Sequence, residues 1–154
     1  MLGRKTYTSE ELDHARTAIA GQLAAYRRLA DAVDATGDPR AQAALEAFEP
    51  RFAEALTLAL DRHFVHRLRV VAGKDGNPLN EVAVLAESLL GDGGVVRPSS
   101  GIKVDRERSV LGLAPGDPVA LSAADFERLA DAFLTELEYR FVAAAAGEVG
   151  STAR

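Results

Sequence analysis

The sequence predicts a mainly α-helical domain with a small β-hairpin, organised around a long antiparallel pair of helices. Three observations lead to this fold class. Apolar residues recur every three or four positions through four segments, which is the period of an amphipathic helix. Short turns rich in glycine, proline and aspartate separate these segments. Residues 102–121 instead alternate apolar and polar side chains around a proline–glycine turn, a pattern that indicates paired strands.

The length and composition are those of a single domain. The chain has 154 residues, of which 47% are hydrophobic and 27% charged, so one core can form. It has no cysteine, which excludes disulfides, thiol catalysis and zinc–thiolate sites. No apolar run approaches the roughly 18 residues that span a bilayer. We expect a cytoplasmic protein that does not contact a membrane, with a tail at 1–8, a helical domain at 9–142 and a frayed tail at 143–154.

The first helix is expected to begin at Ser9. Thr8 and Glu11 have the spacing of a capping box, in which each side chain accepts a hydrogen bond from the backbone amide of the other residue. An apolar row with a mean spacing of about 3.5 residues then predicts a partner helix along the whole length. A second row, on the flank, consists of small side chains that would let another helix approach closely. It comprises Ala18, Gly21, Ala25 and Ala32.

A short turn leads into a second helix. Gly37 is suited to ending the first helix, Asp38 to capping the second, and Pro39 to its first position. The apolar row of the second helix keeps its phase through Pro50 as far as Val71, which predicts one bent helix. The two helices therefore form an antiparallel hairpin.

Three shorter elements are expected to cover this helical hairpin. Asn77 caps a third helix that has Pro78 at its first position and stops at Gly91. The β-hairpin at 102–121 follows. A capping box at Ser122 then opens the last helix, which carries three phenylalanines and is expected to dock against the second helix.

The polar turn between the second and third helices is a candidate site for a ligand or a protein partner. Its glycine, asparagine and proline have a structural explanation as turn, cap and first helical residue. The polar residues around them stand beside a helix N-terminus, which could hold an anion or a partner carboxylate. The candidate residues are Lys74, Asn77, Asn80 and Glu81.

Basic residues form an alternative site, for nucleic acid. They gather at the end of the second helix and around the β-hairpin, although a net charge of −5 argues against general binding of polyanions. The candidate residues are Arg62, Arg67, Arg69, Lys103, Arg106 and Arg108.

Residues 113–121, Leu-Ala-Pro-Gly-Asp-Pro-Val-Ala-Leu, resemble the Leu-x-x-Gly-Asp-x-Val-x-Leu hairpin of the AbrB-like swapped-hairpin transcription regulators. This resemblance implies a dimeric, DNA-binding barrel. It covers these nine residues alone, and the chain lacks a second matching hairpin. We therefore do not assign the chain to that family.

Motifs for catalysis and metal binding are not evident. The chain has no Gly-x-Ser-x-Gly sequence, and only Glu11 and His14 have the Glu-x-x-His spacing that di-iron bundles need twice. His63 and His66 are three residues apart on the second helix, where exposed or core-edge histidines are the simpler explanation. We expect no catalytic residue, no metal and no cofactor.

The function that the sequence favours is a non-enzymatic interaction or assembly protein that forms a homodimer. Two long helices leave more apolar flank than the shorter elements can cover, and a second copy or an unidentified protein partner would cover the remainder. A small DNA-binding regulator is the first alternative. An enzyme or anion-binding protein with its site at the turn 74–81 is the second.

Overall fold

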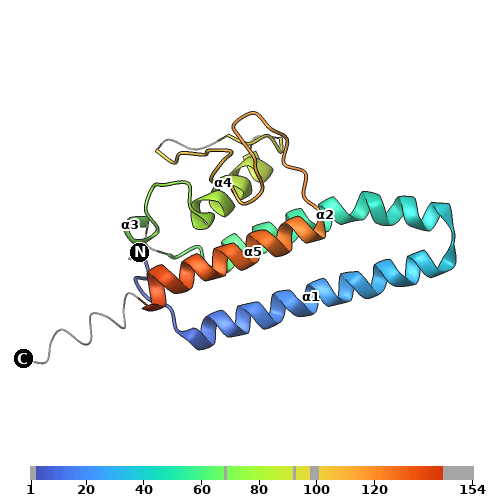
Figure 1. The fold of residues 1–154 in the computed structure, drawn as a ribbon, viewed down its shortest axis with the longest axis horizontal. Coiled ribbons are helices and arrows are strands. Elements are labelled where there is room, and N and C mark those ends of the chain that lie inside the picture. The colour runs from blue at the N-terminus through green and yellow to red at the C-terminus, as the bar shows by residue number, and fades with distance from the viewer. Residues whose placement is uncertain (1–2, 68, 92, 98–100, 144–154) are drawn as a thin grey trace, which may run out of the picture.

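The computed structural model describes residues 3–67, 69–91, 93–97 and 101–143. Within these ranges the chain is mainly helical, as predicted, and has no strands. Two long helices, α1 (Ser9–Thr36) and α2 (Pro39–His63), form the antiparallel hairpin (Figure 1). They are followed by α3 (Arg69–Ala72), α4 (Pro78–Gly91), α5 (Ala123–Glu138) and the π-helical turn η1 (Tyr139–Ala143). In the same ranges no helix combines the length and the apolar character that crossing a membrane requires.

The caps of the two long helices form as the sequence predicts. The Thr8 hydroxyl accepts a hydrogen bond from the Glu11 amide (3.2 Å), and the Glu11 carboxylate accepts one from the Thr8 amide (2.8 Å). Gly37 ends α1 in the left-handed conformation, with φ 62°. The Asp38 side chain caps α2, and that helix continues through Pro50 as predicted.

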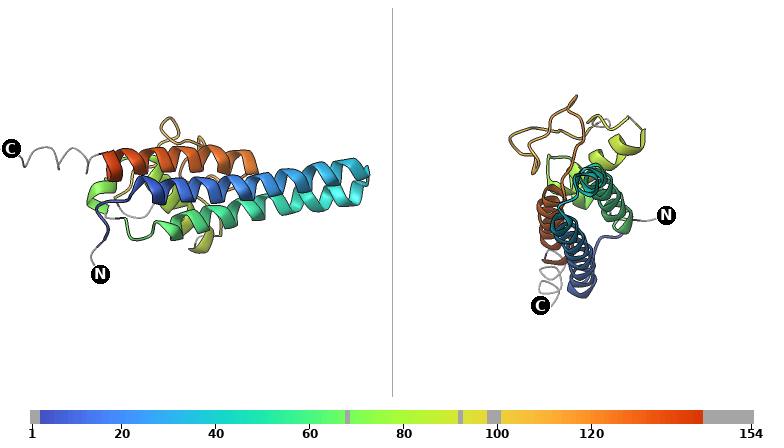
Figure 2. Two further views of the ribbon diagram at one scale, coloured as in Figure 1. Left: turned by 90° about the horizontal axis from the view of Figure 1, so that it is seen from below. Right: turned by 90° about the vertical axis from the view of Figure 1, so that its right-hand side faces the viewer.

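Aromatic rings fill the centre of the core. α5 packs against α1, α2 and α4 (Figure 2), so the predicted docking of the last helix on α2 is confirmed. The fully buried rings are Phe64, Phe126, Phe133 and Phe141. The expected N-terminal tail contributes the buried ring of Tyr7, which lies 5.3 Å from the Phe64 ring and 5.5 Å from the Phe141 ring. Residues 144–154 of the expected C-terminal tail lie outside the described residues.

The predicted β-hairpin at 102–121 is wrong. These residues form turns and irregular loop. The β-pairing that involves them is an isolated antiparallel bridge between Pro118 and Val95. The backbone amides of Val110 and Leu111, which a strand would offer to its neighbour, donate to the Glu81 carboxylate (2.8 and 3.2 Å). The proline and glycine residues therefore shape a loop that is attached to α4 through Glu81.

The prediction that the second helix continues to Val71 is also wrong. α2 ends at His63, and a turn separates it from α3. The Arg67 side chain explains this end, because its guanidinium donates to the Phe64 carbonyl oxygen (2.9 Å) and pairs with Asp61 (2.8 Å). Arg67 thus satisfies a carbonyl group that would otherwise continue the helix.

Towards their connecting turn, α1 and α2 extend past the start of α5 as a two-helix arm, which we define as residues 24–52 (Figure 1). The base of the arm still contacts α5, through Arg27 and Glu49. None of the arm residues is buried. Tyr26 stacks on Phe52, with ring centroids 5.3 Å apart. The partial burial of Tyr26, together with a hydrogen bond to Glu49, raises its pKa to about 12. Where the arm leaves the bundle, Glu49 accepts a hydrogen bond from the Ala123 amide of α5 (2.9 Å).

Candidate functional site

The polar turn between α3 and α4 is built around the Asn77 side chain, which is buried. Its amide group donates to the Ala72 carbonyl oxygen (2.8 Å) and to the Asp75 carboxylate (2.9 Å). Its oxygen accepts hydrogen bonds from the amides of Leu79 and Asn80 (2.9 and 3.2 Å), which is the predicted cap of α4. The donors and acceptors of Asn77 are therefore used within the turn.

Asn80 and Glu81 are also buried and also serve the fold. Asn80 donates to the carbonyl oxygens of Gly73 and Asp75 (3.2 and 2.8 Å), which closes the turn from the helix side. Glu81 accepts a hydrogen bond from the Ser109 hydroxyl (2.7 Å) in addition to the two amides described above. Three of the four residues predicted for a site at this turn thus have structural partners.

Lys74 is the predicted turn residue that faces solvent. It lines a hollow of about 610 Å³ together with Lys103 and Arg108, two residues predicted for nucleic acid. None of these three cations forms an ion pair with another described residue. We call this feature the basic hollow; it is lined by Lys74, Asp75, Gly76, Gly101, Lys103, Asp105 and Arg108. The structure thus joins residues from two sites that the sequence treats separately.

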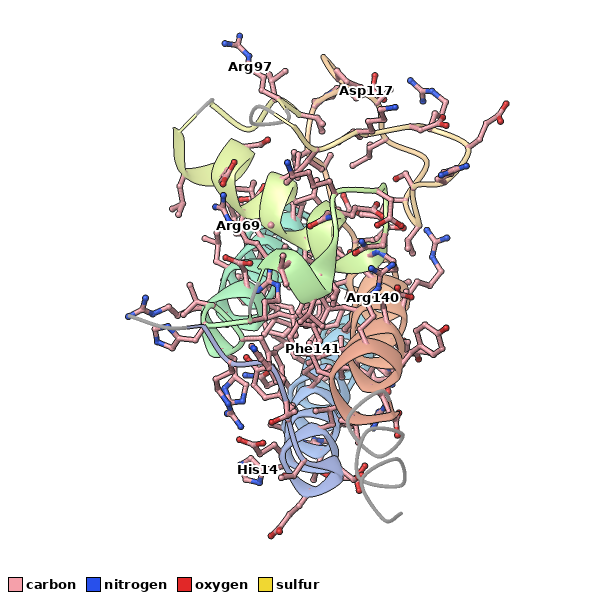
Figure 3. All side chains as sticks on the ribbon, turned by 90° about the vertical axis from the view of Figure 1, so that its left-hand side faces the viewer. His14, Arg69, Arg97, Asp117, Arg140 and Phe141 are labelled. Carbon is pink, nitrogen blue, oxygen red and sulfur yellow. The ribbon has the colours of Figure 1, made fainter. Side chains whose placement is uncertain are left out.

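Both carboxylates of the basic hollow have partners within the chain. The hydrogen bond from Asn77 lowers the pKa of Asp75 below its usual range, and the positive charge of the nearby Arg140 lowers it further. Arg140 lies in η1 after α5 (Figure 3), where its guanidinium is 3.4 Å from the Asp75 carboxylate and donates to the Ala72 carbonyl oxygen of α3 (3.0 Å). Asp105 accepts a hydrogen bond from the Glu107 amide (3.0 Å) and so caps a turn of its own loop.

The other predicted nucleic-acid residues lie outside the basic hollow, although Arg67 and Arg69 line a cleft beside it. Arg67 pairs with a carboxylate of α2, and Arg106 pairs with Asp117, each at 2.8 Å. Arg62 and Arg69 are exposed on α2 and α3. The hairpin on which the resemblance to swapped-hairpin regulators rested is not formed in the described residues. These findings favour a local anion site over a broad nucleic-acid surface.

A cleft of about 520 Å³ adjoins the basic hollow, and Lys74 and Gly101 line both. Its apolar lining residues are Val65, Val70, Ala72, Ala83 and Ile102. Its other lining residues are Asp61, Arg67, Arg69, Gly73, Asn80 and Glu87. Val65 and Val70 are 41% and 84% exposed, so this end of the cleft offers apolar surface to solvent.

A third surface lies on the α1–α2 pair, on the flank away from α5. The flank of α1 that faces α5 carries Arg16 and Arg27, which pair with Glu138 and Glu127. The other flank carries rows of uncharged residues spaced by three, four or seven positions, which places each row along one side of its helix. We define the alanine face as the exposed residues Ala18, Gln22, Ala25, Leu29 and Ala32 of α1 and Ala44, Phe48, Ala55 and Ala59 of α2.

A groove of about 300 Å³ opens between α1 and α2 at one end of the alanine face. It is lined by Ala18, Gln22 and Ala59 of that face together with apolar residues of the core, which include Ile19, Leu56, Leu60 and Phe64. His14 (Figure 3) and His63 also line it. The described residues contain no group of three or more histidines and carboxylates placed to hold a metal ion.

The half of the alanine face that α2 contributes was missed by the sequence analysis. Its signal is a row of small or aromatic residues at spacings of three and four, in which Ala41, Phe48 and Phe52 also belong to the predicted apolar row of the second helix. The row comprises Ala41, Ala44, Phe48, Phe52, Ala55 and Ala59. The predicted small residues of α1, from Ala18 to Ala32, are all exposed, which leaves them open to a partner.

No known protein family, curated protein or solved structure matches this chain. The geometry therefore defines only a general class, which is a helical protein with an uncharged helix-pair face on one side and a basic hollow beside an apolar cleft on another.

Proposed function

We propose that the protein is a non-enzymatic interaction or assembly protein that forms a homodimer through its alanine face. The observation that carries this proposal is the arm, in which no residue between 24 and 52 is buried. Helices in proteins gain most of their stability from burying an apolar face, and an isolated pair gains little. A second hairpin stacked on the alanine face would bury the arm on both copies at once.

The composition of the face supports a helix-on-helix contact. Alanine side chains let two backbones approach closely, and larger apolar side chains between them can fit into the gaps. Leu29 and Phe48 are the large side chains of the face and are 47% and 45% exposed. Exposed apolar residues grouped on one uncharged face indicate a binding surface more strongly than the same residues scattered singly.

The register of the two helices supports an antiparallel arrangement of two copies. Because Tyr26 stacks on Phe52, Ala24 of α1 lies level with Glu54 of α2. We place a two-fold axis between the two copies, perpendicular to the helices and at the level of Ala24 and Glu54. This axis would pack α1 against α1 of the other copy and α2 against α2, each pair antiparallel. Closed two-fold dimers with self-complementary faces are the commonest soluble assemblies.

This single axis would bring both large side chains of the face to the groove of the other copy. Leu29 and Ile19 lie five residues on either side of Ala24, which corresponds to about 7.5 Å along the helix. Phe48 and Leu60 lie six residues on either side of Glu54. Ile19 and Leu60 line the groove, so Leu29 and Phe48 of each copy would enter the groove of the other.

The test is the solution mass of the wild type and of two matched variants. Multi-angle light scattering on the wild type should give twice the chain mass of 16.3 kDa. Ala25→Arg places a long charged side chain on the alanine face and should produce a monomer. Ala43→Arg makes the same change at another exposed position of the arm, off the face, and should leave the dimer intact.

Two results would overturn the proposal. A wild type that stays monomeric at high micromolar concentration would remove the dimer. Dissociation by Ala25→Arg and Ala43→Arg alike would show that the contact lies elsewhere. Circular dichroism of each variant would confirm that its helix content is unchanged.

A further inference from the structure

The basic hollow gathers positive charge from two separate segments. Lys74 comes from the turn before α4, whereas Lys103 and Arg108 come from the loop after it. The segments meet closely at Gly76, where an added Cβ would lie 3.1 Å from the Lys103 carbonyl oxygen. The loop is also attached to α4 through Glu81. These contacts hold the three cations around one space.

The positive charges that line the hollow outnumber its negative charges, because three cations and two carboxylates face it. Its three cations are free of ion pairs among the described residues. Of its two carboxylates, Asp75 faces Arg140 at 3.4 Å and accepts a hydrogen bond from Asn77. Asp105 accepts a hydrogen bond from a backbone amide. The hollow therefore favours an anion that lysine and arginine can contact together.

The adjoining cleft adds apolar surface beside charged side chains, of which Arg67 and Asp61 pair with each other (2.8 Å). Lys74 and Gly101 line both spaces, so a ligand in the hollow can extend into the cleft. The apolar wall there includes Val70, Ala83 and Ile102. An exposed valine beside a cleft gains free energy when an alkyl group covers it, at roughly 25 cal/mol per Å² of buried apolar surface.

We propose that the basic hollow and the cleft together bind a small amphiphilic anion, with its anionic head group at Lys74, Lys103 and Arg108 and its alkyl chain along Val70 and Ile102. The head group is a phosphate monoester or a carboxylate, because both accept hydrogen bonds from lysine and arginine. The site is formed by α3, α4, the turns on either side of α3 and the loop after α4, with Asp61 at the end of α2, and it shares no residue with the alanine face.

Isothermal titration calorimetry on the full chain tests this site with four probes, all below their micelle concentrations. These are decyl phosphate, decanoate, inorganic phosphate and acetate. The wild type should bind a ten-carbon probe at least tenfold more tightly than the short anion with the same head group. Comparison of decyl phosphate with decanoate then identifies which head group the hollow prefers.

Three variants locate the binding. Lys103→Ala should weaken the preferred ten-carbon probe about tenfold, as expected for losing one hydrogen bond to a charged group. Arg62→Ala removes the same charge from α2 outside both spaces and should have little effect. Val70→Asn changes an 84% exposed side chain, so the fold should tolerate it, and it should weaken the ten-carbon probes but not the short anions.

Each contrary result overturns the proposal. Equal affinity for long and short probes, or no measurable binding of any of them, would show that the site does not bind an amphiphilic anion. If Lys103→Ala and Arg62→Ala weaken probe binding equally, the affinity depends on the overall charge of the protein and not on a site in the hollow. A Val70→Asn variant that binds decyl phosphate like the wild type places the alkyl chain outside the cleft.

Discussion

Glu81 connects α4 to the loop that follows it, across 28 to 30 residues of chain. Its buried carboxylate accepts hydrogen bonds from the Ser109 hydroxyl and from the amides of Val110 and Leu111. Backbone amides that lose their partner in a protein interior are costly, since water cannot replace it easily. Glu81 is therefore the residue on which the position of this loop depends most directly.

Replacing Glu81 with alanine should lower the free energy of unfolding by about 3 kcal/mol, because two backbone amides and a hydroxyl lose their acceptor. Urea denaturation followed by circular dichroism measures this loss. Glu87→Ala, at an exposed position of the same helix, is the control and should cost less than about 0.5 kcal/mol. Similar losses in both variants would contradict the role of Glu81.

The sequence predicts the residues whose partners are close in the chain. Thr8, Asn77 and Ser122 were identified as caps because the spacing to their partners is two or three residues. The role of Glu81 could not be predicted in this way, because its partners belong to a distant loop. The basic hollow was missed for the same reason, since Lys74 and Arg108 meet only in the folded chain.

Glu11 gives stability a specific dependence on pH. Its carboxylate accepts hydrogen bonds from the Arg4 guanidinium and from the Thr8 amide, which together lower its pKa from 4.5 to about 2. A lowered pKa means that the folded state binds the proton less well than the unfolded state does. The stabilisation is therefore complete above pH 4.5 and is lost as the pH falls from 4.5 towards 2.

The variant Glu11→Gln should flatten this part of the pH profile. Thermal unfolding between pH 2 and 6 should show a smaller decrease in melting temperature towards acid than the wild type shows. At neutral pH the variant should be less stable by about 1 kcal/mol, the usual contribution of an N-cap interaction. The side chains of Arg4 and Glu11 are 46% and 38% exposed, so added salt should reduce the difference. An unchanged acid slope would contradict this assignment.

At the scale of elements, periodicity predicted the helices better than their ends. The apolar rows of α4 and α5, and of α1 and α2 outside the arm, lie in the core as expected. Within the arm the rows of α1 and α2 are not buried, and Phe48 of the predicted α2 row is 45% exposed. The row of α2 continues past His63, where the helix ends because Arg67 folds back on Phe64. Residues 102–121 have strand-like alternation, yet no neighbouring strand is available to them in the described residues. Side-chain pattern alone does not reveal where backbone amides find acceptors.

The arm is the element whose stability should depend on association. In the monomeric variant Ala25→Arg, amides of residues 24–36 and 39–52 should exchange with solvent at least tenfold faster than those at the base of the same helices, because no arm residue is buried. In the dimeric wild type, the arm and the base should be protected to a similar degree. Hydrogen-exchange mass spectrometry measures both. Equal protection of arm and base in the monomeric variant would show that the arm is stable alone.

For the whole molecule, the two proposed surfaces occupy different sides of the helical framework. The alanine face belongs to the flank of α1 and α2 away from α5. The basic hollow and the cleft are formed mainly by α3, the turn before α4, α4 and the following loop (Figures 1 and 2), and the end of α2 contributes Asp61 to the cleft. Dimerisation would therefore leave the hollow open. Lys103→Ala should weaken the anion without changing the solution mass, so the failure of one proposal leaves the other standing.

The contact between Tyr7 and Phe141 also determines when folding can finish during synthesis. Tyr7 precedes α1, and its amide donates to the Phe141 carbonyl oxygen (3.1 Å) almost at the end of the described chain. The α1–α2 hairpin consists of neighbouring segments and can form early, but contacts between distant segments form late. The emerging hairpin would therefore expose the apolar core residues of α1 and α2, which α5 covers in the folded chain, until α5 leaves the ribosome. A nascent chain that stalls before α5 would present this apolar surface to chaperones and to other nascent copies.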